Sequence, residues 1–200
     1  VRCWDDLQKR YGVAPCLILG ELNERGIAAA CELDITNAVM MRAMGLAADY
    51  PVMLLDVNNN YKNENDKIIL FHCGPVAQTL MDGKGLVTEH KMFAKTDPGC
   101  GWGCNEGRIA AFDMTYSNGF TEDGKFKIYV SEGKFTGEPI EKEYFGCGGV
   151  AEIAGLQNKL LKLAKGGFKH HTTVGMGHMK HVLEEAFSTY LGYEIIDIED

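Results

Sequence analysis

The sequence predicts a mixed α/β protein, in which an α/β segment precedes a region of antiparallel strands. Before residue 74, helical patterns alternate with short apolar runs, as in α/β folds. Between residues 85 and 145, short alternating segments separated by glycine-containing turns are typical of an antiparallel meander or a small β-barrel. The chain has 200 residues and is 46% hydrophobic, which permits a sizeable core.

The first fifty residues carry three helical patterns, and these occupy residues 4–11, 15–25 and 35–48. Asp34 stands where its side chain can cap the third helix. The segment 27–31 is short and apolar, and is interpreted as a buried strand or a turn. Glu32 is therefore expected at a strand-to-helix junction, where α/β proteins commonly place their chemistry.

Two apolar strands are expected next, at residues 51–57 and 67–73, with a polar, Asn-rich loop between them. The first strand ends on Asp56 and the second on His72. Neighbouring strands would thus present a carboxylate and an imidazole at their C-terminal ends. This arrangement indicates a site more strongly than either residue does alone.

The antiparallel region is expected to contain strands at residues 86–93, 108–116, 126–131 and 134–136, and the segment from Gly146 to Gly149 is expected to end it. A helix is predicted at 151–165, a short strand or loop at 170–174, an amphipathic helix from 179 to 191 and a final strand at 193–198.

Four of the six histidines lie in the stretch from Gly166 to His181. They are His170, His171, His178 and His181. Glycines flank the His170-His171 pair and allow close approach of the backbone. Imidazole is a common metal ligand and proton carrier near pH 7, so the stretch indicates a site. The alternative is that several of these histidines are ordinary surface residues.

The candidate site residues are Glu32, Asp56, His72 and His171. Carboxylates with imidazole suit a divalent cation such as Mn²⁺, Mg²⁺ or Co²⁺. Such a cation can polarise the carbonyl of a hydroxy-carbonyl compound, while a carboxylate moves a proton between adjacent carbons. Each residue also has a structural interpretation. Glu32 could be an acid favoured by the helix dipole, Asp56 a turn former and His72 a buried core histidine.

Charge and cysteine content exclude several protein classes. The net charge of −8 argues against a nucleic-acid or anionic-membrane partner, and no apolar run reaches a membrane span. The first residues lack the apolar core of a signal peptide, and the seven cysteines are irregularly spaced. Reduced thiols in a cytoplasmic protein are therefore expected. Cys100 and Cys104 are interpreted as part of a glycine-rich loop, with a zinc site that includes His178 as the weaker alternative.

Six short motifs resemble the C-terminal part of the L-fucose and L-arabinose isomerase family, in the same order and over nearly the whole chain. They are Ala30-Cys-Glu-Leu-Asp-Ile, Leu54-Leu-Asp-Val-Asn, Phe71-His-Cys-Gly, Gly107-Arg-Ile-Ala-Ala, Tyr129-Val-Ser-Glu-Gly and Gly167-Phe-Lys-His-His-Thr-Thr-Val. The loop 58–66 and the Cys100-Gly-Trp-Gly-Cys104 segment depart from the family pattern.

The resemblance implies that Glu32, Asp56 and His171 hold a Mn-type ion, with Mg²⁺ or Co²⁺ as substitutes. It implies that Glu32 and Asp56 form the acid/base pair of an enediol mechanism. His72 matches a further metal-site histidine of the arabinose branch, while the fucose branch differs there. It is expected to be a further ligand or a substrate contact. His170 is expected to orient its neighbour.

The family proteins are longer, so the chain is expected to be the C-terminal portion of an aldose-ketose isomerase, an intramolecular oxidoreductase. Residues 1–48 would end a Rossmann-like α/β domain, and residues 49–200 would form a C-terminal domain with a small antiparallel β-barrel and flanking helices. A sugar substrate and a homo-oligomer of the complete protein are implied, and the chain alone is expected to be nearly inactive. The alternative is a non-catalytic sugar-binding or assembly module.

Overall fold

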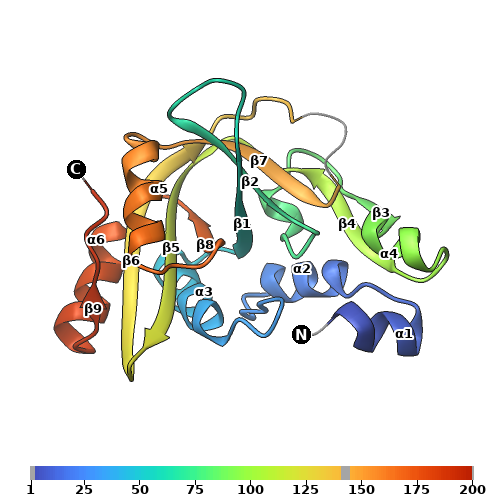
Figure 1. Cartoon of the computed structure of the whole chain (residues 1–200), viewed down its shortest axis with the longest axis horizontal. Helices are drawn as coiled ribbons and strands as arrows, with labels where there is room; N and C mark the ends of the chain where they lie inside the picture. Colours follow the sequence, from blue (N-terminus) through green and yellow to red (C-terminus); the bar gives the residue numbers. More distant parts are fainter. Residues whose placement is uncertain (1–2, 141–144, 200) are drawn as a thin grey trace.

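The computed structural model describes residues 3–140 and 145–199. In this part of the chain, nine strands form one mixed sheet with helices packed around it (Figure 1). The strand order is β3-β4-β7-β2-β1-β8-β5-β6-β9. The predicted α/β character is therefore confirmed. None of the helices in the described residues combines the length and the apolar character needed to cross a membrane.

The strands are β1 (Val52–Asn60), β2 (Lys67–His72), β3 (Leu86–Glu89), β4 (Trp102–Arg108), β5 (Phe112–Glu122), β6 (Lys125–Phe135), β7 (Cys147–Glu152), β8 (His171–Met176) and β9 (Glu194–Ile195). The α-helices are α1 (Gln8–Tyr11), α2 (Cys16–Glu24), α3 (Ile35–Ala48), α4 (Lys91–Thr96), α5 (Leu156–Lys165) and α6 (Lys180–Glu185). Short π turns occupy Cys3–Leu7 and Ala186–Tyr190, and a 3₁₀ turn occupies Gln78–Leu80.

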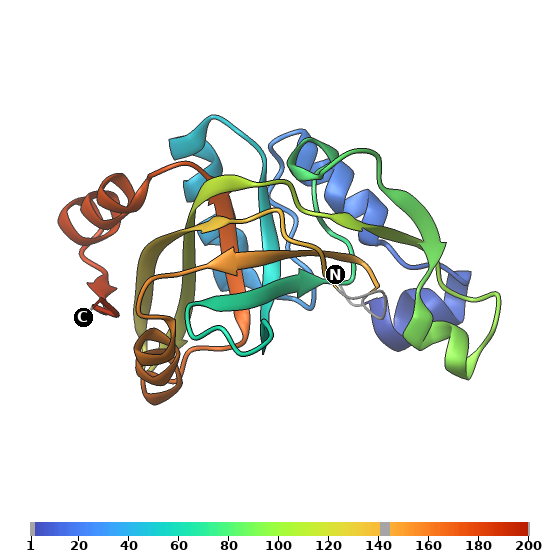
Figure 2. The ribbon, with the colours of Figure 1, turned by 90° about the horizontal axis from the view of Figure 1, so that it is seen from above.

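Six strands, in the order β7-β2-β1-β8-β5-β6, form a ring of pairings because β6 also pairs with β7. The closing contact consists of the pairs Lys134↔Glu152 and Phe135↔Ala151, whereas β5 and β6 pair along their whole lengths. Strands β3, β4 and β9 extend the sheet beyond this ring, and β4 and β9 attach by parallel pairing (Figure 2). The structure therefore supports a curved nine-stranded mixed sheet and not the small antiparallel barrel that we expected.

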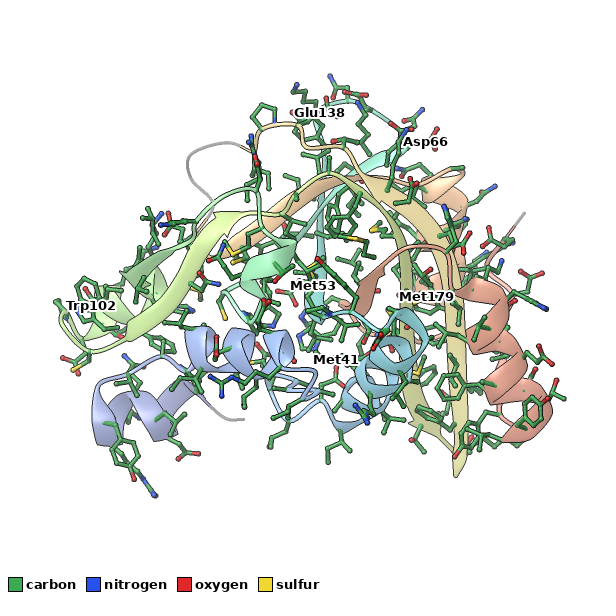
Figure 3. All side chains as sticks on the ribbon, turned by 180° about the vertical axis from the view of Figure 1, so that it is seen from behind. Met41, Met53, Asp66, Trp102, Glu138 and Met179 are labelled. Carbon is green, nitrogen blue, oxygen red and sulfur yellow. The ribbon has the colours of Figure 1, made fainter. Side chains whose placement is uncertain are left out.

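Apolar side chains of β1 point alternately to its two faces, and each face contributes to a separate core cluster. Met53 and Leu55 belong to the cluster inside the ring, together with residues of β2, β5, β6 and β8. Val52 and Leu54 belong to a second cluster against α3, which supplies Met41 (Figure 3). Successive side chains of a strand point to opposite faces, so one apolar run serves both clusters. Strand β1 pairs with β2 and β8, and so is covered on both edges.

Helix α3 begins where the sequence predicted. The Asn37 N–H donates to Asp34 Oδ1 at 3.0 Å, so the Asp34 carboxylate satisfies a backbone group that has no partner within the helix. Of the two interpretations of residues 27–31, the strand is not found, because residues 27–30 have no regular structure, Cys31 lies at a bend and a turn covers residues 32–33. Glu32 thus lies in a turn that leads into α3.

Several predicted strands are displaced. The expected strand 86–93 ends at Glu89 and continues as α4, and the expected strand 108–116 spans the end of β4 and the start of β5. Two of the glycines that were expected to break the β region, Gly148 and Gly149, lie in β7, and Gly146 directly precedes it. A Cβ on Gly149 would meet the Phe135 ring at 2.7 Å. These glycines therefore permit close packing of strands, and do not end the sheet.

The seven cysteines are reduced and form no disulfide, as expected. Cys104 is buried in β4, and Cys100 precedes that strand. Within residues 3–140 and 145–199, neither of them joins His178 in a group of three potential metal ligands. The structure therefore gives no support to the weaker zinc interpretation.

A charged cluster fixes the C-terminal segment to α5 and α6. Glu199 Oε2 lies 2.6 Å from Lys159 Nζ, a buried ammonium, and Glu199 Oε1 lies 2.9 Å from Lys180 Nζ. Ser131 Oγ donates to the same carboxylate at 2.8 Å. Burial tends to raise the pKa of Glu199, but these partners lower it to about 2.

Glu199→Gln is expected to lower the free energy of unfolding by about 1–2 kcal/mol at pH 7, a value reduced because Glu199 is partly exposed. The folded-state pKa lies below the ordinary value, so the carboxylate contributes its full stability above about pH 4.5. This contribution should disappear as the pH falls toward 2. Urea unfolding between pH 7 and pH 2 measures it, with the exposed Glu194→Gln as control. A constant difference across that range would contradict the assignment.

Candidate functional site

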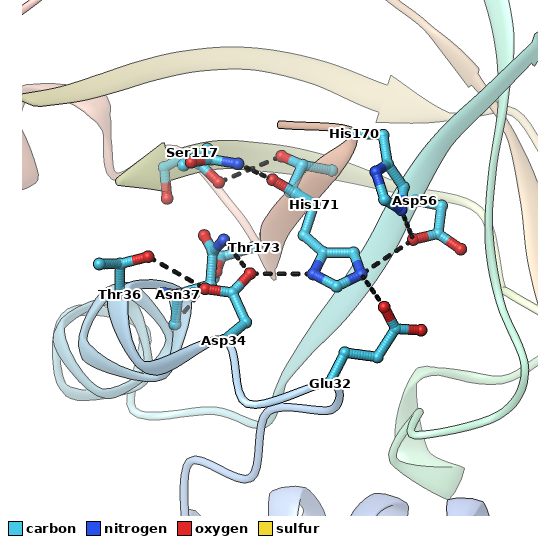
Figure 4. Close-up of polar contacts among 11 residues, drawn as sticks. Glu32, Asp34, Thr36, Asn37, Asp56, Ser117, His170, His171 and Thr173 are labelled. Carbon is cyan, nitrogen blue, oxygen red and sulfur yellow. Dashed lines mark hydrogen bonds and ion pairs between the residues drawn. The ribbon is translucent and has the colours of Figure 1, made fainter. Parts of the chain in front are cut away.

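The five site residues that the sequence predicted lie close together beside the turn before α3, where β2 ends and β8 begins. Figure 4 shows four of them, Glu32, Asp56, His170 and His171. Glu32 comes from this turn, Asp56 from β1 and His72 from the end of β2. His171 begins β8, and His170 precedes it. The antiparallel register pairs Asp56 directly with His171, which brings their side chains together.

Nε2 of His171 is the common point of the two acids. It lies 3.2 Å from Asp56 Oδ1 and 3.9 Å from Glu32 Oε2. His171 is buried, Asp56 is largely covered and Glu32 is half exposed. The carboxylate from β1 and the carboxylate from the turn therefore approach the same imidazole nitrogen from two directions (Figure 4).

Asp34 also belongs to the site, and sequence reasoning assigned it only to the helix cap. Its Oδ2 lies 2.9 Å from His171 Nδ1, while Oδ1 caps α3. Burial tends to raise the pKa of Asp34, but hydrogen bonds from His171, Asn37 and Thr36 lower it to about 2. The ionised carboxylate accepts the Nδ1 proton, so Nε2 of His171 faces the acids. The spacing Glu32-x-Asp34 was the available signal, because both residues border the same turn.

The electrostatics of His171 follow from its two acidic neighbours. Burial tends to lower its pKa, but the hydrogen bond to Asp34 and the nearby Asp56 carboxylate raise it to about 9. Burial also opposes ionisation of Asp56, yet His171 and the charges of the neighbouring histidines lower the pKa of this carboxyl. Without a cation, His171 is thus an imidazolium between the carboxylates of Asp34 and Asp56 at neutral pH.

His170 lies beside Asp56. Its Nε2 is 3.4 Å from Asp56 Oδ1, and its ring centroid is 4.8 Å from that of His171. The hydrogen bond to Nδ1 of His171 comes from Asp34. Asp34 thus makes the direct contact with His171 Nδ1, and His170 Nε2 contacts the Asp56 carboxylate.

His72 is fully buried, and its ring centroid is 5.5 Å from that of His171. Burial lowers its pKa to about 4. The Cys73 backbone N–H donates to His72 Nδ1 at 2.9 Å. His72 Nε2 is buried and accepts or donates no hydrogen bond within the described part of the chain.

Glu32 is held in an uncommon backbone conformation. Its φ is 56°, and that of Leu33 is 60°, both in the left-handed region that disfavours residues with a side chain. Such strain costs on the order of 1 kcal/mol per residue and occurs preferentially at functional sites. Here it aims the Glu32 carboxylate toward His171.

The donor set fits a divalent cation. Asp56 Oδ1 and His171 Nε2 are buried and lack hydrogen-bond partners among the described residues, although they lie close to each other. Two overlapping groups each keep their ligand atoms within 4.8 Å of one another, namely Glu32-His72-His171 and Asp56-His170-His171. Ligands bound at ~2.1–2.3 Å are roughly 3–3.7 Å apart, close to the observed separations. Carboxylate and imidazole donors suit Mn²⁺, Mg²⁺ or Co²⁺.

The other two histidines of the Gly166–His181 stretch lie apart from this group. His178 Nδ1 is 3.2 Å from Glu132 Oε2 and its Nε2 is 3.6 Å from Asp113 Oδ2, at an exposed position. His181 is almost fully exposed, beside Glu185. They match the alternative interpretation of surface histidines.

The sequence of this chain is similar to those of known isomerases. The family described as L-fucose isomerase, C-terminal domain, matches residues 70–199. A sulfoquinovose isomerase from Clostridium sp. (strain MSTE9) is 29% identical over 185 residues, which cover 91% of this chain and 40% of that protein. A sulfoquinovose isomerase from Priestia aryabhattai is 24% identical over 191 residues, covering 92% and 40%. The chain thus spans about 40% of the length of the curated relatives it matches.

Proposed function

The chain belongs to the family of the L-fucose isomerase C-terminal domain, and from this premise we propose that it is the C-terminal portion of a metal-dependent aldose-ketose isomerase. The observation that carries the proposal is the convergence of Glu32 and Asp56 on the buried Nε2 of His171. Residues 1–48 would end an α/β domain of that protein, and residues 49–200 would form its C-terminal domain.

The acids and His171 would hold the cation, with His170 beside the Asp56 carboxylate. When bound, Mn²⁺ or another divalent cation supplies Lewis acidity that polarises the sugar carbonyl. The Asp34 carboxylate accepts the Nδ1 proton of His171 and keeps Nε2 directed at the site. Asp56 Oδ1 and His171 Nε2 are buried away from water, and buried polar atoms without partners cost free energy. A bound cation would supply the missing partner.

The reaction needs one proton to move between neighbouring carbons. A carboxylate of the Glu32–Asp56 pair takes the proton from C2 of the aldose, and the electron pair of that C–H bond forms the double bond of an enediol. The same proton returns to C1, while the hydroxyl proton of C2 passes to the oxygen of C1. The carbonyl therefore moves from C1 to C2 without any external oxidant or reductant.

Isomerisation by the complete protein, with Mn²⁺ added, tests the proposal. L-Fucose and sulfoquinovose belong in the panel because the family and the relatives carry these names. L-Arabinose is added because the sequence motifs also resemble the arabinose branch. We expect the appearance of the corresponding ketose with at least one aldose and its loss on chelation. Sugar binding without turnover under all metal conditions would overturn the proposal and favour a non-catalytic sugar-binding module.

Apolar side chains exposed on the outer faces of α2 and α3 indicate a contact surface of the complete protein. Ile18, Ile35 and Leu46 are each more than 60% exposed, at 63%, 73% and 64%. A groove beside α3 is lined almost entirely by apolar residues, and Phe187 and Leu191 form its far wall. Large apolar patches on an isolated domain favour association.

The 200-residue chain alone is therefore expected to self-associate and to have little isomerase activity. Light scattering coupled to gel filtration, over a range of protein concentrations, measures the association. Ile35→Ser with Leu46→Ser should shift the chain toward a monomer, while Leu86→Ser, at an exposed position on β3, should not. A monomer at all concentrations would contradict the prediction.

A further inference from the structure

We propose that His72 is not a further ligand of the cation but a fixed N–H donor to an oxygen at the reacting end of the sugar. The inference rests on the proposed function, and it deepens it. A ring nitrogen of His72 lies within 4.8 Å of the ligand atoms of Glu32 and His171, so this ring borders the site. By distance alone, His72 could be a ligand of the cation. The hydrogen bond that its Nδ1 accepts argues against this role.

The state of Nδ1 is set by the backbone. The Cys73 N–H donates to His72 Nδ1 at 2.9 Å, and an amide N–H can only donate. Nδ1 therefore uses its lone pair and carries no proton. The Cys73 Sγ, 3.3 Å from the same nitrogen, adds a second group whose proton can point there.

The proton of the imidazole must then sit on Nε2. A neutral imidazole has one N–H, and the ring does not lose both protons at ordinary pH. A cation could bind Nε2 only if the proton moved to Nδ1. That proton would face the Cys73 amide hydrogen, with only 2.9 Å between the two nitrogens. The Cys73 backbone N–H can only donate a hydrogen bond, and it thus opposes binding of a cation by His72.

His171 shows the opposite arrangement. Its Nδ1 faces the Asp34 carboxylate at 2.9 Å, an acceptor that keeps the proton on Nδ1, so a cation that displaces the Nε2 proton of the imidazolium can bind the lone pair of Nε2. Two histidines at one site are therefore fixed in complementary states, one suited to ligation and the other to donation. The difference between the two imidazoles arises from their neighbours, the Cys73 amide at His72 and the Asp34 carboxylate at His171.

The backbone that fixes His72 is itself held rigidly. His72 pairs with Cys147 of β7. Gly146 packs so closely that a Cβ there would lie 2.4 Å from the His72 carbonyl oxygen and 2.7 Å from Cys73 Cα. The Cys73 amide therefore has little freedom to turn away from Nδ1. This close approach also gives Gly146 a role in the site that its sequence position did not indicate.

In the reaction, His72 holds an oxygen and transfers no proton. Loss of the Nε2 proton would leave an imidazolate, and Nδ1 cannot take up a compensating proton. The hydrogen bond from Nε2 strengthens as negative charge develops on the sugar oxygen, so it lowers the barrier to enediol formation. A neutral imidazole can polarise a carbonyl in this way. Proton movement between the carbons stays with the acids.

Measuring Mn²⁺ affinity distinguishes a His72 that binds the cation from a His72 that only donates a hydrogen bond, and it needs no activity assay. We would titrate Mn²⁺ into the 200-residue chain and into His72→Asn, His72→Gln and His171→Gln. Asparagine keeps an acceptor for the Cys73 amide and lacks the donor, whereas glutamine can place an N–H near the Nε2 position. Both His72 variants are expected to bind Mn²⁺ within about threefold of the wild type, and His171→Gln at least ~100-fold more weakly. A loss in His72→Asn equal to that in His171→Gln would overturn the proposal.

Nitrogen-15 NMR of the metal-free chain observes the proton directly. A protonated Nε2 and an unprotonated Nδ1 are expected for His72. The reverse pattern would overturn the proposal whether or not the protein isomerises sugars. This readout and the Mn²⁺ titration therefore remain informative if the proposed function fails. Far-ultraviolet circular dichroism and thermal unfolding identify any variant that does not fold.

Kinetics of the complete protein complete the test. His72→Asn should lower kcat about 10²-fold with Mn²⁺ affinity retained, and His72→Gln should recover part of that loss. Equal and complete retention of kcat in both variants would show that Nε2 contacts no reacting oxygen and would overturn the donor role.

Discussion

Glu32→Gln in the complete protein is expected to lower kcat for isomerisation by at least ~10³-fold at saturating Mn²⁺. An amide cannot take the proton from C2, and loss of general acid–base catalysis alone typically costs about 10²–10⁴-fold. The amide is also a poorer ligand for a hard cation than a carboxylate. Half of the Glu32 side chain is exposed, so the substitution leaves the core unchanged.

Ketose formation from a saturating aldose, with and without Mn²⁺, measures this effect. Glu21→Gln on α2 is a matched control, because it removes an exposed glutamate that forms only a local pair with Arg25. It should retain wild-type kcat and Mn²⁺ affinity. If Glu32→Gln isomerised its sugar at the wild-type rate, the mechanism proposed for Glu32 would be abandoned in favour of the sugar-binding alternative.

Asp34→Asn is expected to weaken Mn²⁺ binding about 10–100-fold, the usual effect of removing a carboxylate that holds a metal-binding histidine. Asparagine still caps α3, since it is as good a cap as aspartate. It lacks the charge that holds the Nδ1 proton of His171, so the Nε2 lone pair is less available and less firmly directed. The effect should therefore appear in metal affinity and not in the stability of the helix.

Calorimetric titration of the 200-residue chain measures this affinity, and urea unfolding of the metal-free protein measures stability. Asp49→Asn at the other end of α3 is the control, because Asp49 has a φ of 49°, which asparagine tolerates well. Unchanged Mn²⁺ affinity in Asp34→Asn would show that the hydrogen bond to Nδ1 does not prepare His171 for a cation.

Much of the candidate site could be inferred from residue types and order. His72 ends β2 and His171 begins β8, so their placement at strand ends followed from local pattern. Asp56 was expected to end its strand, but it lies in the middle of β1. Asp34 was identified as a cap, but its second contact was not. A carboxylate can satisfy backbone groups with one oxygen and an imidazole with the other, and sequence spacing reveals only the first.

The errors in the predicted fold have a common physical origin. The glycines of β7 were expected to end the β region because glycine weakens an isolated strand. In the folded chain they allow β2 and the Phe135 side chain to approach closely, an advantage that depends on distant residues. The same holds for β1, which has partners on both edges although its sequence showed only an apolar run.

The sequence by itself determined the main helices, the central apolar strands and the set of carboxylates and imidazoles available for chemistry. Periodic burial and helix capping are local, and they act on residues that are near one another in the chain. Only the tertiary structure decided the register that sets Asp56 against His171, the ring of strands and the different partners of the two histidine Nδ1 atoms. Those features depend on contacts between segments up to 137 residues apart, such as Asp34 with His171, and the sequence pattern of either segment does not specify its partner.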